Sequence, residues 1–268
     1  MRTPGLPGRP AGRWAAASLA GTLLLAGASL AGAEVAQRGN LRVHVAGSVS
    51  PQALPRTGSA PVAATLEVGI ATTDASAPPQ LQNVRIAINR HSHLDYTGLP
   101  ACRLREIQPA TTAAALAACR AAKVGAGSFR ANVALPEQSP FPSRGKVLAF
   151  NGTLGARHVI FVHVYGTRPF PTSYTLSFAI HRSGGEFPTV LTAELPQSTG
   201  NWGFVTGMAV TLRRSFSYRG RRRSYLSAGC PAPKGFSRVA FPLAETSFSF
   251  ADGRTLQTPI ERSCRVKG

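Results

Sequence analysis

Apolar and polar residues alternate along most of the chain, between turns rich in Gly and Pro. Val84, Ile86 and Ile88 would share one face of a strand, and residues 174–180 show the same alternation. This pattern is typical of antiparallel strands with one buried face. Residues 159–165 are almost wholly apolar, as expected of a strand that is covered on both faces.

One segment has the pattern of a helix. Thr111 or Thr112 can cap its N-terminus, the alanine-rich residues 113–122 propagate it, and Gly125 ends it. We therefore expect a mainly β fold, an antiparallel β-sandwich with one short disulfide-anchored α-helix. One large sandwich and two β units divided near residues 105–127 both fit, because composition shifts little across the helix.

Turn-forming dipeptides and a basic stretch refine this picture. Asn151-Gly152 and Asp252-Gly253 predict hairpin turns. Residues 202–218 predict one long strand with a break or bulge near Gly207. Its C-terminal part begins the arginine-rich run TLRRSFSYRGRRRSY, residues 211–225.

The period of two assigns the side chains of this run to opposite faces. Phe216 and Tyr218 would point towards a core, whereas the neighbouring arginines would meet water. A four-residue hairpin loop would place Tyr225 opposite Phe216. A three-residue loop would turn Leu226 inward instead, and the pattern does not distinguish the two.

Any partner of this basic tip is expected to be an anionic surface polymer rather than a nucleic acid. A single-strand nucleic-acid site needs aromatic rings on the same exposed face as its arginines, and here the alternation separates them. The tip is therefore either simply solvated or in contact with an anionic cell-surface or wall polymer. The candidate residues are Arg213, Arg219, Arg221, Arg222 and Arg223.

The first residues have the pattern of a secretory signal peptide. Three arginines precede an apolar run over residues 14–30, which ends in small residues suited to cleavage after Ala33. We expect residues 1–33 to be removed and residues 34–268 to be secreted as the mature domain. An uncleaved anchor is the alternative, but the apolar run falls short of the roughly 20 residues that span a bilayer.

Neither a lipid anchor nor a wall anchor is expected. The predicted cleavage point lacks the cysteine to which a lipid would be attached. Residues 54–58, LPRTG, match the pentapeptide of wall sorting but lie far from the C-terminus, where that signal acts. We also expect no membrane span in the mature chain.

The net charge of +19 concerns partners rather than fold. It favours anionic partners and faster encounters with them. Outside a cell, such partners are wall polymers, acidic polysaccharides and lipid headgroups.

Four cysteines, an even number in an exported chain, predict two disulfides with three possible connectivities. We favour Cys102–Cys119 and Cys230–Cys264, because each pair closes a short loop in its own half of the chain. A zinc site is the competing interpretation, but it would use close CxxC pairs, which the chain lacks.

The sequence contains few indications of catalysis or metal binding. His91 and His93 are two apart on one predicted strand and are weak candidates for a metal site. No third ligand is evident, and we favour a surface histidine pair at a strand end. The sequence contains no GxSxG or HExxH motif and no glycine-rich phosphate loop. We predict no catalytic residue and no cofactor.

The chain resembles exported proteins of high-GC bacteria to which no activity is assigned. The resemblance rests on LAFNG (148–152), HVYG (163–166), YRGRRRSYLSAGCPAPKGF (218–236), SFSFADG (247–253), RSCRV (262–266) and the cysteine-bounded helix at 100–127. It implies export and shared cysteines, and transfers no functional residue.

Two functional hypotheses follow. The first is a non-enzymatic extracellular module that contacts anionic surface polymers through the arginine-rich hairpin. The second is a secreted enzyme of the hydrolase type, whose site is assembled from distant residues with the histidines as first suspects.

Overall fold

The computed structural model describes Met1 and residues 32–108, 110–134, 137–168, 171–195 and 203–267. Contacts divide the chain into Met1–Leu30 and Ala31–Gly268, and the second unit is described below. The signal peptide predicted over residues 1–33 falls almost entirely outside the described residues. Within them, no helix has both the length and the apolar character needed to cross a membrane.

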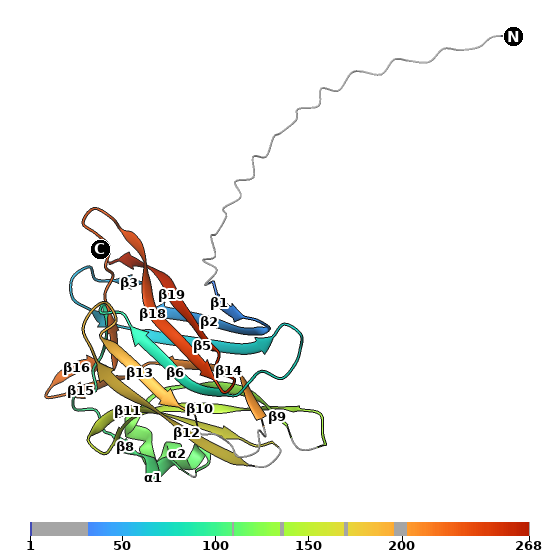
Figure 1. Ribbon diagram of the computed structural model, residues 1–268. Helices are drawn as coiled ribbons and strands as arrows, with labels where there is room; N and C mark the ends of the chain where they lie inside the picture. The colour runs from blue at the N-terminus through green and yellow to red at the C-terminus, as the bar shows by residue number, and fades with distance from the viewer. Residues whose placement is uncertain (2–31, 109, 135–136, 169–170, 196–202, 268) are drawn as a thin grey trace. The chain divides into compact units, whose positions relative to one another are not determined.

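Most of the second unit is one curled sheet with antiparallel and parallel pairs (Figure 1). Its strands are β1 (Glu34–Arg38), β2 (Leu41–Ser50), β3 (Ala53–Leu54), β5 (Ala63–Thr72), β6 (Leu81–Ile88), β8 (Cys102–Arg103), β9 (Lys123–Val133), β10 (Phe141–Leu154), β11 (Arg157–Gly166), β12 (Thr172–Arg182), β13 (Thr189–Glu194), β14 (Gly203–Leu212), β18 (Arg238–Phe250) and β19 (Thr255–Val266). They lie in the order β1-β2-β5-β14-β9-β10-β11-β12-β13-β6-β18-β19-β3, and β8 adds to β10 in parallel. The mainly β prediction is confirmed, whereas the two-sheet sandwich stays a prediction.

The predicted alternation sets the inner face of this sheet. Val84, Ile86 and Ile88 of β6 all pack against the interior clusters. Leu176 and Phe178 of β12 do the same, as the alternation over residues 174–180 predicts. The strands β6 and β12, which flank β13 in the sheet, therefore face the same apolar interior.

The two ends of the curled sheet meet at a seam between β1, β2 and β19. The Arg262 guanidinium on β19 donates to the Gly47 carbonyl on β2 and pairs with the Glu34 carboxylate on β1. Further along, Arg254 donates to the Arg38 carbonyl (3.1 Å) and to Asn40 Oδ1 (2.8 Å). Two arginine side chains thus join sheet ends that share no backbone ladder among the described residues.

Two smaller sheets accompany the large one. β4 (Ala60–Pro61), β17 (Leu226–Ala228) and β7 (Ser92–Leu94) form a three-stranded sheet, which we call the cap sheet. Leu94 and Leu226 of the cap sheet pack into the main interior cluster. β15 (Ser215–Tyr218) and β16 (Arg221–Ser224) form a separate hairpin.

Short helices cover the outer face of β10 and β11. They are α1 (Leu104–Ile107), α2 (Thr112–Cys119) and a 3₁₀ turn (Arg120–Ala122). Thr111 caps α2, and its hydroxyl accepts the Ala114 N–H at 3.1 Å. The predicted helix is therefore confirmed, with α1 as an additional single turn. Gly125 does not end it, because the helical turns stop at Ala122 and Gly125 lies within β9.

This cover explains the apolar run at residues 159–165. Ile160 and Val162 of β11 face the interior cluster, whereas Val159 and Phe161 pack under the helices. A strand buried on both faces carries apolar residues at consecutive positions.

The two predicted turns had opposite outcomes. Asp252-Gly253 does connect β18 to β19, with Gly253 at φ 81°. Asn151-Gly152 is not a turn but lies inside β10. There the Asn151 amide donates to the Pro100 carbonyl at 3.0 Å, and a Cβ on Gly152 would come within 2.4 Å of the Phe161 ring.

Candidate functional site

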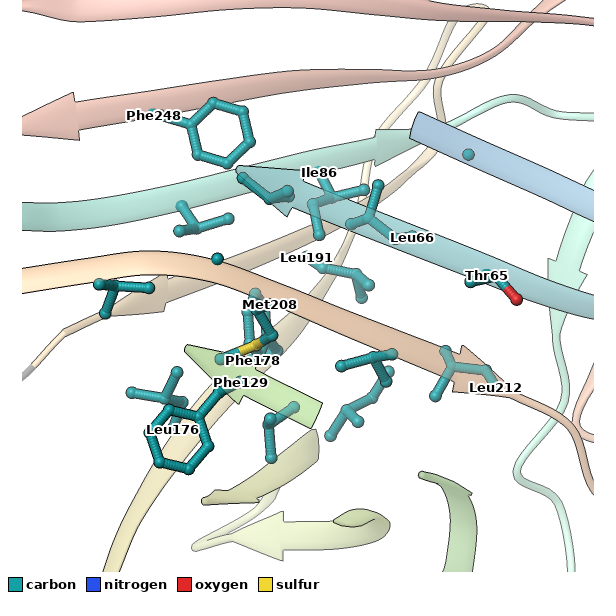
Figure 2. Close-up of a pocket in the computed structure, with 18 of the residues that line it drawn as sticks. Thr65, Leu66, Ile86, Phe129, Leu176, Phe178, Leu191, Met208, Leu212 and Phe248 are labelled. Carbon is teal, nitrogen blue, oxygen red and sulfur yellow. The ribbon is translucent and has the colours of Figure 1, made fainter. Parts of the chain in front are cut away.

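The interior of the curled sheet contains an apolar cavity of about 420 Å³. Its walls come from β2, β5, β9 and β14 on one part of the sheet, and from β6, β11, β12, β13 and β18 on the other. Figure 2 shows side chains from these strands around the space, among them Leu66, Ile86, Phe178 and Met208. The volume falls within the range of roughly 300–1,000 Å³ typical of small-molecule sites.

The cavity persists partly because small residues occupy inner positions where larger ones would fill it. Ala64 and Ala131 both line it. Several larger lining residues, such as Met208, are only partly buried although they face the interior. The core is therefore incompletely packed.

Charge is absent from the described lining. It contains no Asp, Glu, His, Lys or Arg, and Tyr174 is its one ionisable residue. Its hydroxyl groups include that of Thr65, which shares a hydrogen bond with the Thr211 hydroxyl (2.8 Å). The hydroxyl of Ser92, by contrast, is buried without a partner among the described residues.

The cavity extends from the cap sheet to the exposed start of β12. Ser92 and Leu94 of the cap sheet line one end, where the Leu94 carbonyl accepts from Arg182 at the C-terminus of β12 (3.2 Å). Tyr174 near the N-terminus of β12 also lines the cavity and is 45 % exposed. Tyr174 precedes Arg182 by eight positions, so these two residues lie about 26 Å apart along the strand.

The arginine-rich hairpin differs from both predicted geometries. Its loop has two residues, Arg219 and Gly220, with φ of 51° and 72°. Positive φ at both positions is the requirement of the tight hairpin turn that follows strand twist best. The four-residue and three-residue loops are therefore both wrong, and Tyr225 lies buried beyond the hairpin.

The pairing also corrects the predicted separation of rings from guanidinium groups. Phe216 pairs directly with Arg223, so the two side chains share a face. The Arg223 guanidinium lies 5.6 Å from the Tyr218 ring centre and donates to Asp95 at 2.8 Å. The Tyr218 ring itself rests on Gly98, where a Cβ would come within 2.1 Å of it.

The rest of the predicted strand fits better. β14 ends at Leu212 and β15 begins at Ser215, so the run is broken in two. The register against β9 shifts between Val205 and Gly207, which confirms the predicted bulge. Trp202, placed at the start of this strand, lies outside the described residues.

The remaining arginines of the tip are available to a partner. Arg213, Arg219 and Arg222 are exposed, as is Arg221. None of the four forms an ion pair with an acidic side chain in the part of the chain that the structure describes. Arg219 additionally lies 5.3 Å from the Tyr218 ring centre.

His91 and His93 do not gather a metal site. Among the described residues, the one group of three metal-ligand side chains is Cys102, Glu106 and Cys119. His91 instead contacts the Phe241 ring edge-on, and burial, helped by nearby Arg90, lowers the pKa of the imidazole.

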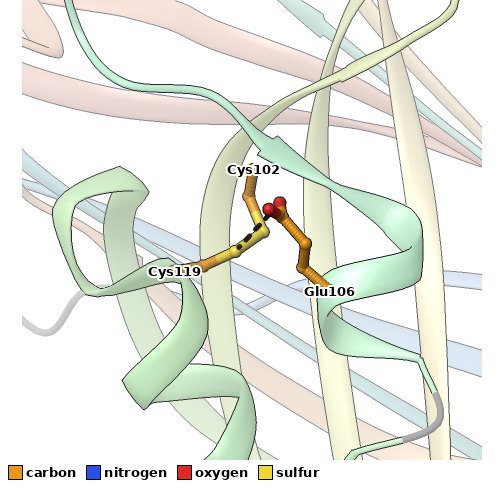
Figure 3. Close-up of side chains that lie close together, drawn as sticks. All are labelled: Cys102, Glu106 and Cys119. Atoms are coloured by element: carbon orange, nitrogen blue, oxygen red, sulfur yellow. Dashed lines mark hydrogen bonds between the residues drawn. A yellow bond between two sulfur atoms is a disulfide. The ribbon is translucent and has the colours of Figure 1, made fainter.

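The cysteine group is a disulfide rather than a metal site. Cys102 is bonded to Cys119, and Cys230 to Cys264, each with Cα atoms 5.6 Å apart, so both predicted pairings are confirmed. Figure 3 shows the Glu106 carboxylate beside the first bridge, 3.8 Å from Cys119 Sγ. That carboxylate accepts the Arg103 N–H at 2.6 Å, which fixes it at the start of α1. The role of this group is structural.

Sequence reasoning missed the cavity. Its lining residues alternate like those of any buried strand face, so the pattern does not reveal whether the interior is filled. The available signal was the recurrence of Gly and Ala at inward positions, such as Ala64, Gly127 and Ala131.

Comparison with known proteins does not add a functional assignment. No protein-family model, curated protein or solved structure matches this chain. The resemblance to exported proteins of high-GC bacteria accordingly stays a prediction.

Proposed function

We propose that this protein is an exported, non-enzymatic binding module that holds an uncharged apolar molecule inside its curled sheet. The carrying observation is the cavity of about 420 Å³ with a lining free of charged residues in the described chain. A water molecule takes about 30 Å³ and needs two to four polar partners, which this lining rarely offers. Binding of an apolar ligand would therefore be favourable, because the ligand replaces water that has few hydrogen-bond partners.

Three further features support the proposal. Both disulfides suit an oxidising compartment, in line with the predicted signal peptide. The β2–β5–β14 part of the sheet lies across the cavity from the β6–β18 part, which favours the sandwich arrangement. The enzyme alternative gains little support, because neither His91 nor His93 lines the cavity.

Binding of phenylnaphthylamine, an uncharged fluorescent reporter of apolar sites, tests this proposal. Val210 lies on β14 with its side chain lining the cavity. Val210→Phe should fill part of the space and weaken binding at least tenfold. Val35→Phe makes the same change at a residue that is 52 % exposed, and should leave binding unchanged.

Two results would overturn the proposal. One is a folded wild-type protein that does not enhance the fluorescence of the reporter. The other is equal affinity in wild type and Val210→Phe, because the reporter would then bind elsewhere. Circular dichroism and melting curves of each variant establish that it is folded.

We propose a second function for the hairpin, contact with an anionic surface polymer. Arg219, Arg221 and Arg222 favour it, because they are exposed and form no ion pair with an acidic side chain among the described residues. Arg221→Ser/Arg222→Ser should elute earlier in salt from an immobilised polyanion than wild type. The charge-matched control Arg144→Ser/Arg265→Ser should elute with wild type. Equal shifts in both double variants would contradict a hairpin site, because net charge alone would then explain retention.

A further inference from the structure

We infer that the ligand carries one neutral hydrogen-bonding group at an end of an elongated apolar body, and that Ser92 binds this group at the cap-sheet end of the cavity. This inference rests on the proposed function and specifies its ligand. The class it points to is a neutral lipid with a single hydroxyl or carbonyl group.

In the described part of the chain, the Ser92 hydroxyl lacks the hydrogen-bond partner that a buried polar group normally has. The residue is only 5 % exposed and lines the cavity, yet its Oγ has no hydrogen-bond partner among the described residues. Native proteins rarely leave a buried hydroxyl unpaired, because it loses its bonds to water and gains none in return. A group supplied from the cavity would satisfy it.

The surroundings of Ser92 offer no substitute. The nearby lining consists of apolar side chains such as Ile88, Leu94 and Leu226. The Ser92 N–H already donates to the Asn89 carbonyl (2.9 Å), and the strand pairs with β17 opposite Ala228. Ser92 lines the cavity, and its hydroxyl, one donor and one acceptor, is left for a group supplied from that side.

The lining also determines the charge of the partner group. A carboxylate placed beside Ser92 would lose its hydration without meeting a cation, since no Lys or Arg is among the described lining residues. Burial lowers the pKa of neighbouring His91, which keeps that imidazole uncharged at neutral pH, and it does not line the cavity. A hydroxyl or carbonyl group fits this end, whereas an acid does not.

The residues that line the cavity indicate the length and polarity of the ligand. Apolar residues of β6, β12, β13 and β14 line the space between Ser92 and Tyr174. A molecule that reaches from Ser92 to Tyr174 is therefore elongated and apolar along its length.

Displacement of phenylnaphthylamine by three twelve-carbon probes, dodecanol, dodecane and dodecanoate, tests this inference. Wild type should bind dodecanol roughly three- to tenfold more tightly than dodecane, the gain of one hydrogen bond. At pH 8 dodecanoate should bind more weakly than dodecanol. Ser92→Ala should bind dodecanol and dodecane equally, while Ser92→Thr keeps the hydroxyl and should restore the preference.

The control is Ser227→Ala, one strand away in the cap sheet and outside the described lining, which should keep the preference of wild type. An unchanged dodecanol preference in folded Ser92→Ala would overturn the inference, as would tighter binding of dodecanoate than of dodecanol. Failure of the proposed function looks different, since the reporter would then not bind wild type at all.

Discussion

Glycines on the inner face of β9 allow neighbouring strands to approach closely. A Cβ on Gly127 would lie 1.8 Å from the Ala209 carbonyl oxygen of β14, and one on Gly125 would lie 2.5 Å from the Thr211 carbonyl oxygen. Both contacts are with backbone, which cannot rotate away as a side chain can. These two positions therefore maintain the close pairing of β9 with β14 beside the cavity.

Replacement of Gly127 by Ala should lower the free energy of unfolding by about 1–3 kcal/mol, the usual range for overpacking. Urea denaturation measures this loss. Gly184→Ala is the matched control, because nothing lies within 4 Å of its added Cβ, and it should change stability by less than about 0.5 kcal/mol. Equal effects at both sites would contradict the close approach.

The burial of His163 makes the stability of the fold depend on pH. The ring is fully buried under the helices, and its Nε2 donates to the Ala110 carbonyl at 2.9 Å. The other ring nitrogen, Nδ1, has no partner among the described residues. Desolvation therefore lowers the pKa of His163, because a proton on Nδ1 would bring an unbalanced charge into the interior.

The sign of the pH dependence follows from this lowered pKa. Below about pH 6.5 the unfolded chain binds a proton at His163 that the folded chain does not, so stability falls as pH falls. The loss should reach at most about 1.4 kcal/mol per pH unit. Denaturation between pH 7.5 and 5 should show a shallower fall in His163→Gln, whereas His181→Gln, at an exposed ring, should retain the fall of wild type.

At the scale of elements, the seam of the sheet depends on side chains rather than on a backbone ladder. The Arg262 guanidinium bonds to Gly47 of β2, and reaches the Glu34 carboxylate of β1, where one N–O distance is 3.2 Å. Both partners are largely buried, so the pair is better shielded from water than a surface ion pair. This contact fixes the first strands against the last one.

Loss of this guanidinium should loosen the seam. Arg262→Ala should lower the free energy of unfolding by about 1.5–3 kcal/mol, as expected for hydrogen bonds to charged groups. Arg265→Ala removes an exposed arginine of the same strand and should cost less than about 0.5 kcal/mol. If chemical denaturation shows the same stability for both variants, the seam does not depend on Arg262.

Elements were predictable from the sequence where local chemistry determines them. Alternation identified the faces of β6 and β12, the hydroxyl of Thr111 capped α2, and loop length paired the cysteines. The prediction failed where a distant partner decides. Asn151-Gly152 stays in strand because Pro100 and Phe161 contact it, and Arg219 adopts a positive φ that its residue type disfavours.

For the molecule as a whole, the sequence predicts which residues face inward but not how completely they fill the interior. The residues that line opposite sides of the cavity come from strands that are far apart in the chain. The sequence therefore does not show which small and large side chains face each other. Val210 on β14 and Leu191 on β13 reach the same space only because four strands of the sheet curl between them. The cavity is therefore a property of the curled sheet, and no single segment encodes it.

The most direct test of the central claim is a crystal structure of the mature protein with a dodecanol that carries bromine at the end of its chain. We expect an anomalous bromine peak inside the cavity, with continuous density running past Leu176 and Leu191 to the hydroxyl of Ser92. Bromine found only on the surface, or an interior filled by the protein's own side chains, would contradict it.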